Sequence, residues 1–210
     1  LAPDDDPLDA AAPRPAASGM ALGEAVRTRA FAALFLALMA ASLGLFIPFV
    51  HLVPYAEDHG VAHGAAVLLV SGIGVGSTAG RFLLGGIADR IGRRLSFGLM
   101  FVGMGCMLLW WLASVASWQL AVFALVFGTF YGGLVALAPS IAVDFFGGKS
   151  ASAIIGVLYA SVAVGTFAGP LLAGFAYDLL RSYTLPILAS TVTMFLGALA
   201  VGLMGPPPGR

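Results

Sequence analysis

The segment that decides the fold is Gly85-Gly86-Ile87-Ala88-Asp89-Arg90-Ile91-Gly92-Arg93-Arg94, a short basic stretch between two long apolar runs. Each of these runs is long enough to cross a membrane as a helix. The stretch is too short to travel far, so we expect it to join two neighbouring antiparallel helices. Because Lys and Arg near the ends of membrane helices are retained in the cytoplasm, the arginines also predict which side the connection faces.

The composition of the whole chain agrees with a membrane protein. Hydrophobic residues make up 60% of the chain and charged residues 10%, and the mean hydropathy is +1.00. These values lie far outside the range of soluble domains. Only helices satisfy the backbone in lipid without a closed sheet, so we predict an all-α polytopic fold. Six segments are long and apolar enough to span the bilayer: 30–55, 65–87, 95–114, 118–142, 151–176 and 184–204.

Charge and composition divide the chain and orient it. Residues 1–28 are rich in Ala, Pro and Asp and predict a flexible cytoplasmic linker, followed by a six-helix bundle over 29–205 and a cytoplasmic tail over 206–210. With both termini inside, eight of the ten basic residues are cytoplasmic, whereas Arg181 is outside and Arg81 lies within a span. We therefore predict a multi-pass protein of the plasma (inner) membrane with both termini in the cytoplasm. The zero net charge gives no indication of a nucleic-acid partner.

An internal repeat indicates how the six helices are related. Residues 75–89, VGSTAGRFLLGGIAD, align without gaps on residues 164–178, VGTFAGPLLAGFAYD, and seven of the fifteen positions are identical. The first copy runs toward the predicted cytoplasmic side and the second runs away from it. One sequence unit used in both membrane orientations is typical of an inverted repeat of three helices plus three.

The basic stretch reads G-x-x-x-D-R-x-G-R-R and resembles the cytoplasmic signature of the major facilitator superfamily. Residues 48–61 (PFVHLVPYAEDHGV), 80–94 (GRFLLGGIADRIGRR) and 169–178 (GPLLAGFAYD) resemble its monocarboxylate porter and oxalate/formate antiporter group. The resemblance implies the carboxy-terminal half, helices seven to twelve, of a secondary active transporter that moves a small organic anion, a monocarboxylate or dicarboxylate, by alternating access. The implied partners are the amino-terminal six-helix half and the lipid bilayer. Symport, antiport and coupling to protons all remain open.

Arg81 is the first candidate for binding the substrate. An ionised side chain inside a span is costly and usually faces a cavity or a partner, although snorkelling to the surface is the alternative. A guanidinium grips a planar carboxylate with two hydrogen bonds. Ser77 and Thr78 lie one helical turn away and are predicted to line the same wall. In monocarboxylate porters an aspartate stands where Ser77 stands here, so the resemblance to their proton-coupling pair is broken at this position.

Other polar residues within spans are weaker candidates for the same cavity. The imidazole of His51 could meet a proton or a carboxylate, or it could tie two helices together; Tyr55 lies one turn beyond it. Pro48 and Pro54 are expected to bend or open this first helix. The remaining polar side chains that we expect near the cavity are Thr129, Tyr131, Tyr159, Ser161 and Thr166.

Residues of the basic stretch are predicted to act in conformational change. The resemblance implies that a charge cluster here latches the cytoplasmic side in one state, whereas the simpler alternative is a positive-inside stop signal. The predicted gating residues are Gly85, Asp89, Arg90, Gly92, Arg93, Arg94 and Asp144.

Two other classes of function were compared with the transporter. An intramembrane serine protease needs G-x-S-G, which the sequence lacks, and it also lacks a nucleotide-binding loop, a His-rich metal cluster and H-E-x-x-H. We therefore predict no enzyme, no catalytic residue, no metal and no cofactor. A facilitator-superfamily transporter of another small solute, or a non-transporting membrane scaffold or sensor, remains the alternative.

Overall fold

The computed structural model describes residues 18–207, and these residues are helical apart from short connections. The first membrane span consists of α2 (Arg29–Leu45) and α3 (Ile47–Asp58), and a single turn of helix, α1 (Leu22–Ala25), precedes it. The other five spans are α4 (His63–Ile91), α5 (Arg93–Leu112), α6 (Ser117–Phe146), α7 (Ala151–Leu180) and α8 (Thr184–Leu203). The prediction of an all-α bundle with six membrane spans is confirmed. The protein is a multi-pass integral membrane protein.

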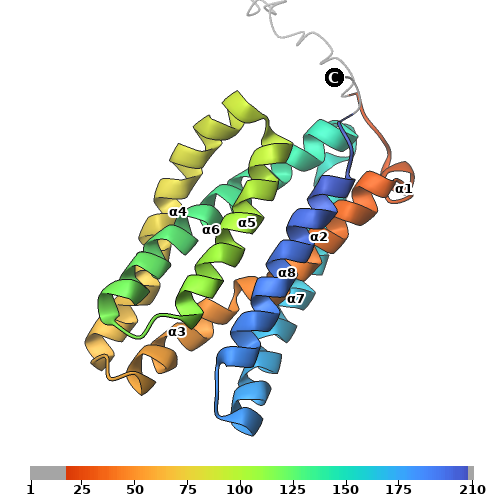
Figure 1. The fold of residues 1–210 in the computed structure, drawn as a ribbon. Helices are drawn as coiled ribbons and strands as arrows, with labels where there is room; N and C mark the ends of the chain where they lie inside the picture. The colour runs from red at the N-terminus through yellow and green to blue at the C-terminus, as the bar shows by residue number, and fades with distance from the viewer. Residues whose placement is uncertain (1–17, 208–210) are drawn as a thin grey trace, which may run out of the picture.

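The helices run up and down, so that the connections gather at two ends of the bundle (Figure 1). We call one the arginine end: it holds Gly92, the turn 147–150 and both ends of the described chain. The other, the tyrosine end, holds the turns 59–62, 113–116 and 181–183. At the arginine end a single residue, Gly92, separates α4 from α5. Gly92 has φ +97°, a backbone conformation that favours glycine, which explains how so short a connection reverses the chain.

The first span is broken near its middle. Its helix ends at Leu45 and restarts at Ile47, so Phe46 belongs to the end of α2 and the start of α3. Pro48 lies in the first turn of α3, where its missing N–H cannot continue the ladder of α2. The break therefore occurs where Pro48 predicted a bend, whereas Pro54 is accommodated inside α3.

Helix packing follows the inverted repeat. If α2–α3, α4 and α5 correspond to α6, α7 and α8, then a contact between α4 and α6 should have its counterpart between α7 and α2. Both of these pairs pack extensively. The same exchange relates the α2–α8 contact to the α5–α6 contact, and it maps the α5–α8 contact onto itself. The network of contacts is thus symmetric under the exchange that the repeat in the sequence predicted.

Glycines at aligned positions make the equivalent contacts. Gly80 of α4 lies so close to α6 that a Cβ would overlap with the carbonyl oxygen of Thr129. Its repeat partner, Gly169 of α7, lies equally close to the carbonyl oxygen of Leu43 in α2. Small residues allow helix backbones to approach in membranes, where van der Waals packing drives association. The repeat therefore preserves the two close contacts on which the bundle depends.

The helices extend beyond the apolar segments, and part of the predicted linker is structured. Asp144 lies in the last turn of α6, beyond residue 142, where the predicted apolar segment ended. Residues 18–28, assigned above to the flexible linker, pack on the bundle: Met20 N–H donates to the Phe146 carbonyl at 2.8 Å, and Ala25 is fully buried. Thr28 caps α2 by accepting from the Phe31 N–H at 3.1 Å. The remainder of the predicted linker, 1–17, and tail residues 208–210 lie outside the described residues.

Candidate functional site

Two spans leave much of their length uncovered. Only 28% of the apolar window of α4 and 22% of that of α7 are buried within the bundle, compared with 39% or more for each of the other four. These two helices are partners in the inverted repeat, so the unit is open on symmetric flanks. On α4 the uncovered surface includes Ser71, Gly74, Thr78 and Arg81. We call the uncovered side of α4 and α7, together with the parts of α2 and α6 between them, the open face.

Arg81 lies on the open face and far from both ends of its helix. It precedes the last residue of α4, Ile91, by ten residues, or about 15 Å along the axis. The predicted apolar segment ended at residue 87, which put Arg81 closer to the end of its helix than the structure does. The side chain is exposed and makes no hydrogen bond or ion pair to any of residues 18–207. It is therefore an uncompensated cation near the middle of a span, where an anion is the natural partner.

Two tyrosines lie on other helices of the open face. Tyr131 of α6 lies between Thr129 and Gly132, the residues at which α4 packs closely against α6, and Tyr159 is on α7. Both tyrosines line a cavity of about 150 Å³, whose wall also includes Ser42, Phe46 and several aliphatic side chains. Tyr131 packs edge-on against Phe46 and Phe49, with ring centroids 6.2 and 5.3 Å away. Phe46, at the helix break, thus forms part of the wall of a small, mostly apolar pocket into which two tyrosines and Ser42 bring hydroxyl groups.

The pocket lies near the middle of the membrane spans. Tyr131 is at the centre of α6, and Arg81 is four residues from the centre of α4, or about 6 Å. The break at Phe46 is likewise interior to the first span. Substrate sites of inverted-repeat transporters lie near the midplane, where discontinuous helices meet the repeat interface. Arg81, Tyr131 and the helix break at Phe46 all lie in the interior of their spans.

Not all of the predicted site residues reach this pocket. Thr78 lies on the same side of α4 as Arg81, and its hydroxyl donates to the Gly74 carbonyl at 3.1 Å. Thr166 lies on the same side of α7 as Tyr159, and its hydroxyl donates to the Val162 carbonyl at 2.7 Å. Ser77 instead is buried against Gly132 of α6. It does not share the exposed surface of Arg81.

His51 and Tyr55 belong to the interior of the bundle toward the tyrosine end. The His51 Nε2 lies 3.2 Å from the Pro170 carbonyl of α7, so this ring ties two helices together. The Tyr55 hydroxyl donates to the Ser114 carbonyl at 2.8 Å, next to the end of α5. The structure does not bring either side chain to Arg81.

The tyrosine end carries a second polar cluster. The Tyr177 hydroxyl donates to the Asp58 carboxylate at 2.8 Å, and the rings of Tyr177 and Tyr183 stack with centroids 4.2 Å apart. Tyr183 lies between α7 and α8, and burial raises its pKa to about 12. Its phenol therefore stays neutral at physiological pH, so that the Asp58 carboxylate is the charged member of this cluster.

The predicted gating residues divide into two groups at the arginine end. Arg93 bridges two helices: its guanidinium donates to Asp144 of α6 at 3.1 Å and to Asp89 of α4 at 3.4 Å. Arg94 donates instead to the Val201 and Gly202 carbonyls, at 3.2 and 2.6 Å, in the last turn of α8. These are carbonyls that a helix end leaves without partners. Arg90 is exposed, and Gly85 has open space around its Cα.

Sequence reasoning did not identify Ser42 and Phe46 as part of the pocket. The only indication in the sequence was Pro48, which predicted a bend in this helix. It could not predict which side chains near the bend would line a pocket. Among residues 18–207, no group of His, Cys, Asp and Glu side chains is arranged to hold a metal ion.

The fold and the open face define a class of protein: a polytopic membrane protein built as an inverted repeat, with an exposed arginine within one span. The family follows from comparison with known proteins. The model of the Major Facilitator Superfamily matches residues 30–210, and the chain belongs to that superfamily of transporters.

Within this superfamily, the chain is similar to several individual transporters. The chain is 34% identical over 160 residues to Monocarboxylate transporter 12 of Xenopus laevis, covering 74% of this chain and 35% of that protein. It is 28% identical over 184 residues to Aspyridones efflux protein apdF of Emericella nidulans, covering 85% and 37%. The fold resembles the solved human organic anion transporter MFSD10 with a TM-score of 0.62 at 21% identity, covering 82% and 47%. The chain thus spans about a third of the length of the curated relatives it matches.

Proposed function

We propose that the chain is one half of a secondary transporter of small organic anions, monocarboxylates or dicarboxylates, and that the open face is one wall of its pathway. The observation that carries this proposal is Arg81, which is exposed near the middle of α4, on the segment that packs against α6 next to Tyr131. A guanidinium binds a carboxylate through two charge-assisted hydrogen bonds. Tyrosine hydroxyls add donors and aromatic surface around the rest of a small anion. The names of the monocarboxylate transporter relatives support the same substrate class.

The second wall is proposed to come from an amino-terminal unit of six helices. A substrate at the open face of this chain alone would have lipid on its other side, and an unpaired arginine there is costly. A facing unit with a similar fold would enclose the pocket and allow alternating access by rocking. Orientation with both termini in the cytoplasm of the plasma (inner) membrane is part of the same proposal and rests on the distribution of arginines.

We propose that any coupling of transport to protons uses an acidic residue of the amino-terminal six-helix unit. In the described part of the chain, the acidic residues of the membrane spans all lie near helix ends. They are Glu57, Asp58, Asp89, Asp144 and Asp178. Ser77 stands at the position of the porter aspartate and is buried against α6. The His51 Nε2 is already hydrogen-bonded to the Pro170 carbonyl. None of these groups is placed to exchange a proton with an anion held at Arg81.

The 210-residue chain alone is expected not to transport. Reconstituted into proteoliposomes, it should give anion uptake that rises linearly with concentration, as empty liposomes do. The same chain reconstituted together with the amino-terminal half should give saturable uptake. Saturable uptake by a chain shown to be monomeric would contradict the proposed two-wall pathway.

The Arg93 bridge is expected to affect conformation more than affinity. Arg93→Gln breaks contacts to both Asp89 and Asp144, which are partly exposed, so the change in the equilibrium between inward-open and outward-open states should be about fivefold at most. Accessibility labelling of a cysteine in the cavity of the intact protein measures that equilibrium. Lys149→Gln, which removes an exposed charge at the same end, is the control. A large loss of affinity with unchanged labelling would place Arg93 in substrate binding instead.

A further inference from the structure

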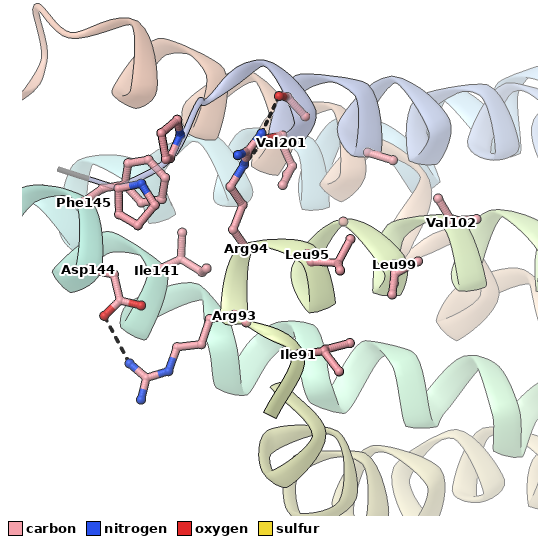
Figure 2. Close-up of a pocket in the computed structure, with 16 residues that line it drawn as sticks. Ile91, Arg93, Arg94, Leu95, Leu99, Val102, Ile141, Asp144, Phe145 and Val201 are labelled. Carbon is pink, nitrogen blue, oxygen red and sulfur yellow. Dashed lines mark hydrogen bonds and ion pairs between the residues drawn. The ribbon is translucent and has the colours of Figure 1, made fainter. Parts of the chain in front are cut away.

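A groove at the arginine end is separate from the open face. It has a volume of about 570 Å³ and lies between α5, α6 and α8 (Figure 2). Its walls are mostly aliphatic, with Leu95, Leu99 and Val102 along α5 and Ile141 on α6. Leu95 is 58% exposed and Leu99 is 49% exposed, so the groove opens outward from the helix bundle. In a membrane-spanning bundle such an opening faces the acyl chains of the bilayer.

Arg94 stands at the mouth of this groove as a positioned cation. Its guanidinium is fixed by the Val201 and Gly202 carbonyls, and Figure 2 shows it reaching from α5 to the end of α8. Both partners are neutral, and no acid among residues 18–207 pairs with it. The nearby Asp144 carboxylate is bonded to Arg93. Arg94 therefore keeps its full charge at the boundary between the apolar groove and the polar surface.

The dimensions fit one chain of a lipid. From Arg94 to Val102 the lining extends eight residues along α5, or about 12 Å into the span. A single aliphatic chain entering from the mouth would lie along Leu95, Gly98 and Leu99, and its phosphate would remain beside Arg94. Basic pockets between membrane helices on the cytoplasmic side bind anionic head groups by this combination of apolar and ionic contact.

We propose that the groove between α5, α6 and α8 is a binding site for an anionic phospholipid, whose phosphate is held by Arg94 and whose acyl chain fills the aliphatic lining. Arg94 then links lipid binding to the last turn of α8. The site is independent of the substrate pathway, because its residues lie on a different side of the bundle from Arg81, Tyr131 and Tyr159.

Native mass spectrometry of the intact, delipidated protein tests the proposal, with phosphatidylglycerol and phosphatidylcholine of identical acyl chains as probes. The wild type is expected to bind phosphatidylglycerol about fivefold more tightly or better. Arg94→Gln should remove the preference, whereas Arg94→Lys should retain part of it. Arg27→Gln, the loss of an exposed charge at the same end but outside the groove, should leave it unchanged.

Two further measurements separate the lipid from simpler explanations. Gly98→Leu fills the groove without touching Arg94 and should weaken phosphatidylglycerol binding by at least a similar factor, because Gly98 has only a side-chain neighbour, Val201, at 3.7 Å. Glycerol phosphate, which carries the anion without acyl chains, should not compete. The proposal is overturned if Arg27→Gln and Arg94→Gln lower binding equally, if Gly98→Leu has no effect, or if glycerol phosphate displaces the lipid. If Arg94→Gln has a lower melting temperature but keeps the preference for phosphatidylglycerol, the proposal is also wrong, and Arg94 serves only to cap the end of α8.

Discussion

Arg81→Ala is expected to weaken carboxylate uptake by the intact transporter by roughly thirty- to a hundredfold in apparent affinity. The physical reason is the loss of a bidentate charge-assisted contact worth on the order of 2–3 kcal/mol. Arg81→Lys keeps the charge but loses the planar fork, so it should also transport poorly. Concentration-dependent uptake of a labelled carboxylate in proteoliposomes measures both variants.

The matched control for Arg81 is an exposed arginine outside both the open face and the predicted gating residues. Arg27→Ala removes such an arginine and should leave the apparent affinity within about twofold, as expected for a surface charge. If Arg81→Ala instead transports with the affinity of the wild type, Arg81 has no role in binding the anion and the open face needs another function.

Gly80→Val and Gly169→Val are expected to abolish the folded bundle. In each case the first carbon of the new side chain would overlap with a backbone carbonyl oxygen of the facing helix, that of Thr129 or of Leu43. Separating two helices that pack along their length should cost about 3 kcal/mol, the upper end of the usual range for overpacking. The yield of monodisperse protein after detergent extraction, and its melting temperature, report the loss.

Gly74→Val is the control for these glycine variants. Gly74 is on α4 as well, but nothing lies within 4 Å of the position of its Cβ. The same change in helix propensity is therefore made without the overlap, and we expect normal yield. Equal yields for Gly74→Val and Gly80→Val would mean that the α4–α6 contact is looser than the structure has it.

Most of the fold followed from the sequence, because membrane thickness fixes the length of each apolar segment. The symmetry followed from the seven identities between residues 75–89 and 164–178. The helix ends were less accurate: hydropathy marks where the apolar layer stops, whereas α6 continues through Asp144 to Phe146, where Asp144 pairs with Arg93 and Phe146 is buried. The prediction of a linker up to residue 28 did not anticipate that Met20 bonds to the end of α6, since a Pro- and Ala-rich composition carries no information on such contacts.

The candidate site was predictable in part. Arg81, Thr78 and Tyr159 stood out as polar groups within apolar spans, and all three are exposed on the open face. Ser77 and Thr78 are adjacent in sequence and both lie one turn from Arg81, so periodicity could not say which of them is buried; the contact with Gly132 decides it. His51 finds its partner, the Pro170 carbonyl, on a helix more than a hundred residues away. Such a tie depends on tertiary packing that no local pattern specifies.

The measurement that tests the open face most directly is the labelling of Thr78→Cys, in a Cys106→Ser background, by a membrane-impermeant thiol reagent. Thr78 lies on the exposed side of α4 one turn from Arg81, and Cys106 is the single cysteine of the chain. If the open face lines an aqueous pathway in the intact protein, the cysteine should react, and a transported carboxylate should slow the reaction. No reaction at Thr78→Cys in either conformational state, with uptake preserved, would show that this face lies against lipid and would contradict the account.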